Sequence, residues 1–251
     1  MREIMNCVIN RQLDDQFAKA WYNLGGDFSY MFSKKVLAYC KRNAFAPKNV
    51  LDVYCGAGNF LAEMQKAGIK CVGTEGSAAF VKFNQENHAG MEFLHTPALN
   101  VFNTKEKFDL ITCIYDLVNF METYQEWQLF FASVYKQLNK GGKFMFDYNT
   151  LKRLKNWDTV VFEQSNDMDY VQSVKPNVYD KTVINYVYYI KNSNNKYHKT
   201  SAIYTETSFE TSKVLEALKK AGFKNVEICD FNLNPATNPE LRNKVHIVAT
   251  K

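Results

Sequence analysis

The chain has 251 residues, of which 46% are hydrophobic and 15% aromatic, and this apolar content excludes a generally disordered protein. Lys and Arg number 31 against 26 Asp and Glu, and a formal net charge of +5 is smaller than a dedicated nucleic-acid binder would carry. The six cysteines form no Cys-x-x-Cys pair and no zinc-ligand spacing with histidine. We therefore expect no metal site and a reducing, cytoplasmic compartment. Because no run of about 18 apolar residues occurs, we also expect no membrane segment.

Short apolar runs alternate with amphipathic segments through the first 150 residues. The runs typical of buried strands are 49–54, 70–75, 91–95, 108–114 and 143–147. The segments typical of helices are 59–67, 77–87 and 123–138, with a further helix at 29–43 inside an N-terminal helical gate that spans residues 1–45. Strands and helices in alternation predict a mostly parallel sheet covered on both faces.

The pattern changes after Thr150. Residues 160–207 are strand-like, and the polar turn 191–196 separates two aromatic-rich runs. The alternation then resumes with a helix at 211–221 and strands at 226–229 and 245–249. This organisation predicts one domain, formed by residues 1–150 and 208–251, with an inserted antiparallel lid over the substrate at 151–207.

The most informative segment is 50–60, a strand that runs into a turn with glycine at positions 56 and 58 and then into a helix. Glycine lets the backbone adopt positive φ and come close to a ligand. Glu75 follows at the end of the next predicted strand, where a carboxylate can accept hydrogen bonds from ribose hydroxyls. Leu61 stands where a dinucleotide fold has its third glycine, and no Gly-Lys-Ser/Thr follows the turn. The pattern favours an adenosine-type cofactor.

The segment Leu51-Asp-Val-Tyr-Cys-Gly-Ala-Gly-Asn-Phe60 resembles the first motif of class I S-adenosylmethionine (SAM)-dependent methyltransferases. Glu75 is similar to the acid of the family's second motif, residues 108–120 resemble the fourth motif, and residues 138–147 resemble its Gly-Gly turn into the fifth strand. The resemblance runs from about residue 20 to the C-terminus, and it is greatest for the branch that methylates small-molecule amines. It implies a Rossmann-like α/β fold, a seven-stranded mostly parallel sheet with an antiparallel last strand, a small antiparallel lid, and SAM as the cofactor.

Two positions depart from the family pattern. Tyr54 replaces the usual first glycine, a substitution associated with the RNA 5-methyluridine branch, and residues 96–99 lack the third-motif acid that often meets adenine. The nucleophilic Ser-Cys-Asn and Asp-Pro-Pro-Arg segments of that RNA branch are absent from the sequence. RNA methylation and a non-catalytic SAM-binding protein of the same fold remain the alternatives.

The resemblance assigns a set of residues to the cofactor: Tyr22, Asp52, Gly56, Ala57, Gly58, Glu75, Gly76, Ala98, Leu99, Ile114 and Tyr115. Candidates to hold a neutral amine and take its proton are Tyr115, Asp116, Asp147 and His198. The first three could instead cap a helix or pack, and alternating tyrosines in the insertion are more typical of a half-buried sheet face than of a binding site. We expect a small-molecule methyl acceptor, methylated by direct in-line displacement without a metal, no nucleic-acid partner, and a monomer or homodimer.

Overall fold

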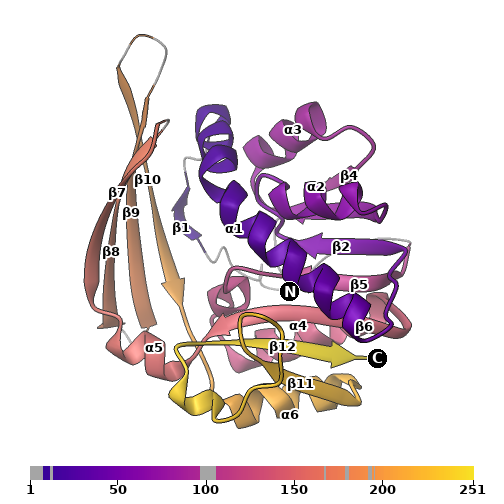
Figure 1. Cartoon of the computed structure of the whole chain (residues 1–251). Helices are drawn as coiled ribbons and strands as arrows, with labels where there is room; N and C mark the ends of the chain where they lie inside the picture. Colours follow the sequence, from indigo (N-terminus) through magenta and orange to yellow (C-terminus); the bar gives the residue numbers. More distant parts are fainter. Residues whose placement is uncertain are drawn as a thin grey trace, which may run out of the picture.

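The computed structural model describes residues 8–11, 14–96, 106–166, 168–178, 181–191, 194 and 196–251, which form two sheets and the helices around them (Figure 1). The larger sheet has seven strands. In spatial order they are β11 (Asn225–Cys229), β12 (Lys244–Thr250), β6 (Leu138–Asn149), β5 (Phe108–Cys113), β2 (Asn49–Val53), β3 (Lys70–Glu75) and β4 (Glu92–His95). Only β12 runs antiparallel to its neighbours within this sheet, so the predicted fold class is confirmed.

Helices cover both faces of the larger sheet because successive strand residues point to opposite faces. Leu51 and Ile111 face a core built with α4 (Tyr124–Gln137) and α6 (Thr211–Ala221). Val50 and Leu110 face the opposite core, which is built with α1 (Asp15–Arg42) and α2 (Asn59–Lys66). Helix α3 (Ala78–Asn87) lies beside α1 and β4 on this second face. The carboxyl ends of the parallel strands are thus left open for a ligand.

Helix α1 is longer than the predicted helix at 29–43, because it begins at Asp15 and continues through Gly25 and Gly26. The Asp14 side chain accepts a hydrogen bond from the Phe17 N–H at 2.9 Å and caps the helix. The N-terminal half is held by tertiary packing that sequence periodicity does not reveal, since Phe17 is buried against the smaller sheet.

The smaller sheet has five antiparallel strands in the order β1-β10-β9-β8-β7. Four of them come from the predicted insertion: β7 (Thr159–Gln164), β8 (Met168–Val178), β9 (Lys181–Lys191) and β10 (Tyr197–Glu206). The short helix α5 (Leu151–Asn156) leads into them from β6. The fifth strand, β1 (Val8–Arg11), pairs with β10 and lies in the segment expected to be helical, because its stability comes from hydrogen bonds to a distant strand.

Figure 1 shows the two sheets side by side, with the first part of α1 between them and the rest of the helix over the larger sheet. One face of the smaller sheet packs on α1 and α3 through Met168, Val174, Ile184 and Tyr188. None of the helices in the described part of the chain has the length and hydropathy needed to span a bilayer.

Candidate active site

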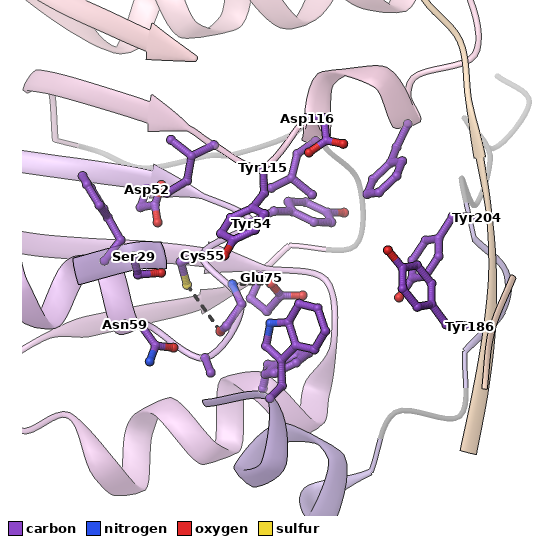
Figure 2. Close-up of a pocket in the computed structure, with 18 of the residues that line it drawn as sticks. Ser29, Asp52, Tyr54, Cys55, Asn59, Glu75, Tyr115, Asp116, Tyr186 and Tyr204 are labelled. Carbon is purple, nitrogen blue, oxygen red and sulfur yellow. Dashed lines mark hydrogen bonds between the residues drawn. The ribbon is translucent and has the colours of Figure 1, made fainter. Parts of the chain in front are cut away.

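A cavity opens between the carboxyl ends of β2, β3 and β5 and the inner face of the smaller sheet (Figure 2). Its volume is about 1110 Å³, including the solvent at its mouth. The predicted site residues that line it are Asp52, Gly56, Ala57, Glu75, Ile114, Tyr115 and Asp116. Ligand sites of open α/β sheets lie at this edge, so the cavity is the candidate active site.

The turn between β2 and α2 forms one wall of the cavity. Gly56 and Gly58 have φ of +55° and +76°, which favours glycine at both positions. A Cβ atom on Gly58 would lie 2.9 Å from the His88 ring, so this position also lacks room for a side chain. The Gly56 N–H donates a hydrogen bond to Glu75 Oε2 at 2.9 Å, and this bond joins the turn to the end of β3.

Glu75 is 3% exposed, and both of its carboxylate oxygens accept a main-chain hydrogen bond. Besides the bond from Gly56, Oε1 accepts the Ser77 N–H at 2.9 Å. Each carboxylate oxygen has a second lone pair, which leaves acceptor capacity toward the cavity. Glu75 can therefore hold a hydroxyl-bearing ligand without giving up its structural bonds.

Tyr54 adopts a left-handed conformation, with φ of +58°, at the position where the family pattern has glycine. Its ring lies against Gly76, where a Cβ atom would be 2.9 Å from the Tyr54 hydroxyl oxygen. The large side chain at position 54 is accommodated because position 76 has none. Two positions that are far apart in the sequence thus compensate each other.

Asp52 lies at the base of the cavity and is 1% exposed. The Thr112 hydroxyl donates a hydrogen bond to Asp52 Oδ1 at 2.6 Å. Burial and the charge of Glu75 raise the pKa of Asp52 to about 7, although the Thr112 bond opposes this rise.

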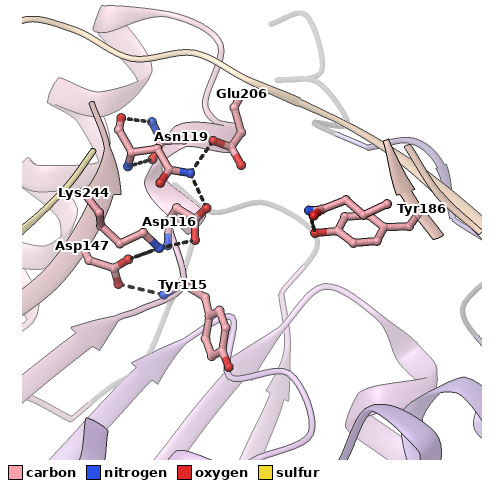
Figure 3. A network of polar contacts seen from close by, with 9 residues as sticks. Tyr115, Asp116, Asn119, Asp147, Tyr186, Glu206 and Lys244 are labelled. Atoms are coloured by element: carbon pink, nitrogen blue, oxygen red, sulfur yellow. Dashed lines mark hydrogen bonds and ion pairs between the residues drawn. The ribbon is translucent and has the colours of Figure 1, made fainter. Parts of the chain in front are cut away.

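Two consecutive residues after β5, Tyr115 and Asp116, have left-handed backbone with φ of +70° and +52°. Their N–H groups donate hydrogen bonds to Asp147 Oδ1 at 2.8 Å and Oδ2 at 3.0 Å (Figure 3). Such backbone costs about 1–3 kcal/mol per residue unless its surroundings hold it. Asp147, buried at the end of β6, supplies that support and positions both residues at the cavity.

Lys244, at the start of β12, forms ion pairs with two carboxylates at this corner of the site. Its Nζ lies 2.9 Å from Asp147 Oδ2 and 2.9 Å from Asp116 Oδ1. Burial alone would raise the pKa of Asp147, but the charges of Lys244 and of neighbouring His246 hold it below its usual value. Asp147 is therefore an anion bound within the structure.

Glu206, the last residue of β10, brings a further carboxyl group to the cavity and was not among the predicted site residues. The Asn149 side-chain NH₂ donates to Glu206 Oε2 at 2.8 Å and to Asp116 Oδ2 at 2.5 Å (Figure 3). Burial, followed by the negative charge of Asp116, raises the pKa of Glu206 well above its usual value. No local pattern around residue 206 indicates this pairing, because the fold brings the strand ends together.

Aromatic side chains form the wall opposite the glycine turn. Tyr186 and Tyr204 project from the smaller sheet into the cavity, as Figure 2 shows, and Phe120 stacks on Tyr204 at 5.4 Å between ring centroids. Tyr188 also borders the cavity but is 1% exposed, because it packs against Phe17. The alternating tyrosines of the insertion therefore serve both the sheet core and the cavity wall.

Known proteins resemble this chain in sequence and in fold. A family model described as a methyltransferase domain matches residues 28–228, more than half of the chain. The chain belongs to the methyltransferase domain family. This membership confirms the resemblance to class I SAM-dependent methyltransferases that the glycine turn and Glu75 suggested.

Individual proteins match this methyltransferase over most of its length. A protein of Geobacillus sp. (strain WCH70) with a provisional methyltransferase name is 23% identical over 227 residues, which cover 87% of this chain and 89% of that protein. A SAM-dependent methyltransferase from Clostridium acetobutylicum ATCC 824 has a TM-score of 0.80 at 17% identity, with 94% of this chain and 98% of that chain covered. The sugar N-methyltransferase KedS8 from Streptoalloteichus sp. ATCC 53650 has a TM-score of 0.74 at 17% identity, with 100% and 98% covered. These two structures have the same fold as this chain.

Several predicted site residues of the methyltransferase do not line the cavity. Tyr22 packs against Phe83 and His88, and its carbonyl accepts a hydrogen bond from Asn59, while its neighbour Trp21 lines the cavity instead. Gly58, Gly76 and Asp147 lie behind the cavity wall and shape it. Ala98 and Leu99 lie outside the described residues.

His198 also lies apart from the cavity lining. Its Nε2 is 2.7 Å from Asp14 Oδ2, and the side chain is 40% exposed near the start of β10. Within the described residues, no cluster of His, Cys, Asp and Glu side chains could hold a metal ion. Of the four candidates for proton transfer, Tyr115 and Asp116 are the ones at the cavity.

Proposed function

We propose that this methyltransferase transfers a methyl group from SAM to the nitrogen of a small-molecule amine. The observation that carries the proposal is the division of one cavity into two chemically different halves. The half at β2 and β3 has the glycine turn and Glu75, whereas the half at the smaller sheet has tyrosines and two carboxyl groups, Asp116 and Glu206.

The first half fits the cofactor. Glu75 has free acceptor capacity for the ribose hydroxyls, and Gly56 presents a backbone without a side chain beside it. Trp21, Ile114 and Tyr115 add apolar surface around these polar groups. When bound there, SAM supplies an electrophilic methyl group on a positively charged sulfur.

The second half fits an amine. Aromatic faces attract a cation by about 0.5–2 kcal/mol each, and Tyr186, Tyr204 and Phe120 offer such faces. Asp116 and Glu206 lie beside them and can accept N–H hydrogen bonds. The fold shared with a sugar N-methyltransferase supports the same class of acceptor.

The contribution of the chain is to align the reactants and exclude water. The strained turn at Tyr115 and Asp116 lies where the two halves meet, and Asp147 fixes it with two hydrogen bonds. The acceptor nitrogen and the methyl group can then be held in line. This arrangement requires no protein nucleophile.

The proposal is tested by incubating the purified protein with SAM and a panel of small amines, amino sugars included, and measuring S-adenosylhomocysteine (SAH) formation. Each amine is paired with the alcohol that carries hydroxyl in place of the amino group. We expect turnover with amines and none with the matched alcohols. Methylation of the alcohols or of bulk RNA would contradict an amine acceptor, and SAH binding without turnover on any of these acceptors would support the non-catalytic alternative.

A further inference from the structure

Glu206 is a buried carboxyl group at the cavity, and no residue in the described part of the chain forms an ion pair with it. We propose that Glu206 binds the ammonium group of the acceptor and takes a proton from it before methyl transfer. This assignment rests on the proposed function and names the group that would make the amine reactive.

Glu206 interacts with the Asp116 side chain but differs from Asp116 and Asp147 in its ion pairs. Lys244 lies 2.9 Å from both Asp116 and Asp147, whereas no ion pair to Glu206 occurs among the described residues. Glu206 is 2% exposed, and Asn149 holds its Oε2 at 2.8 Å with a neutral amide hydrogen. The carboxyl group is therefore fixed and desolvated, and the nearby cation, Lys244, is paired with two other carboxylates.

The groups around Glu206 favour its protonated form when no cation is bound. Asp116 is the nearest negative charge, Lys244 is shared between two other carboxylates, and the phenol of Tyr186 is uncharged. Burial and Asp116 together raise the pKa of Glu206, and Lys244 and the Asn149 bond only partly oppose this. A cation that enters between Glu206 and the tyrosines would supply the missing charge and favour release of the proton.

One turnover returns Glu206 to its protonated starting state. Glu206 releases a proton to solvent as the ammonium ion binds, and its carboxylate next accepts a proton from that ammonium. The neutral nitrogen uses the freed lone pair to form the N–C bond while the electron pair of the C–S bond stays on sulfur. The methylated product leaves as an ammonium ion, SAH leaves uncharged at sulfur, and Glu206 is again protonated, so each turnover releases one proton.

The proposal can be tested without knowledge of the natural acceptor. Choline is a cation with no proton to lose, and 3,3-dimethylbutan-1-ol is its neutral isostere. Calorimetric titration of each into the SAH complex at pH 7, in two buffers of different ionisation enthalpy, gives both the affinity and the number of protons released. We expect choline to bind at least tenfold more tightly than the alcohol and to release about one proton per site, in line with proton linkage.

The matched variants locate that proton. In Glu206→Gln the release should disappear, whereas Glu216→Gln, which changes an exposed acid on α6, should release the proton as the wild type does. If Glu206→Gln fails to fold, infrared difference spectra of the wild type with and without choline should show loss of a protonated carboxyl band. Equal binding of choline and the alcohol, no choline binding, proton release that persists in Glu206→Gln, or an unchanged carboxyl band would overturn the proposal. Loss of SAH binding or of all methyl transfer would instead contradict the proposed function.

Discussion

Glu75 combines two roles, because it fixes the glycine turn through main-chain hydrogen bonds and faces the cavity. Replacement by alanine removes the acceptor that we propose for the ribose hydroxyls, and we expect SAH binding to weaken by about 1–3 kcal/mol, the range for a hydrogen bond to a charged group. Calorimetry measures this loss, and circular dichroism shows whether the fold is kept. Glu216→Ala should bind SAH like the wild type, and an unchanged affinity of Glu75→Ala would remove the assignment.

Asp52 makes stability depend on pH. Its folded-state pKa of about 7 exceeds the value of about 3.9 in an unfolded chain, so the folded state binds more protons between these values and stability is lost as pH rises through this range. In the Asp52→Asn variant the amide does not titrate, and its oxygen can still accept the Thr112 bond. Between pH 5 and pH 8 the unfolding free energy of the wild type should therefore fall by about 2–3 kcal/mol relative to that of Asp52→Asn, as measured in urea titrations. A difference that does not change with pH would show that Asp52 is ionised in the folded state at both pH values.

The elements differ in how much of them the sequence could predict. Strands such as β2 and helices such as α4 carry their own periodicity and caps, including the capping box at Thr123 and Glu126, and they were found where the pattern predicted them. The first half of α1 and all of β1 depend on contacts with residues far along the chain, so local pattern did not reveal them.

The site likewise has a part that local sequence pattern predicts and a part that depends on distant contacts. The glycine turn follows β2 and Glu75 ends the adjacent strand β3, and this spacing is visible in the sequence, so the half of the cavity that we propose for the cofactor could be located from it. In the half that we propose for the acceptor, Asn149 joins residues from the ends of β5, β6 and β10, and no sequence interval encodes that meeting. Glu206 was missed for this reason.

Tyr188 holds the smaller sheet to α1. It is 1% exposed, and its ring meets that of Phe17 edge to face at 4.7 Å. We expect Tyr188→Ala to lower the unfolding free energy by about 3–5 kcal/mol, as for other large aromatic side chains removed from a core. Tyr197→Ala serves as the control, since Tyr197 is 52% exposed on β10 and should change stability by less than about 0.5 kcal/mol. Similar urea midpoints for the two variants would mean that the smaller sheet does not rely on this contact.

At the scale of the whole molecule, the two sheets share α1, α3 and the cavity between them, so we expect them to unfold together. Trp127 reports on the core of the larger sheet, and Trp157 lines the cavity beside α5. Fluorescence of variants that keep only one of these tryptophans should give coincident urea transitions. SAH at 100 times its Kd should raise the unfolding free energy measured by each reporter by about 2.7 kcal/mol. A transition of the Trp157 reporter at lower urea would show that the smaller sheet unfolds on its own.

The pairing of β1 with β10 also has a consequence for synthesis on the ribosome. Val8 is synthesised before its partner Tyr204, which follows it by 196 positions. At 5–20 residues per second, β10 emerges about 10–40 s after β1. Helix α1 and the first strands of the larger sheet have time to assemble during that interval, while β1 still lacks its partner strand. The smaller sheet therefore gains β1, one of its two edge strands, only after β10 has been synthesised.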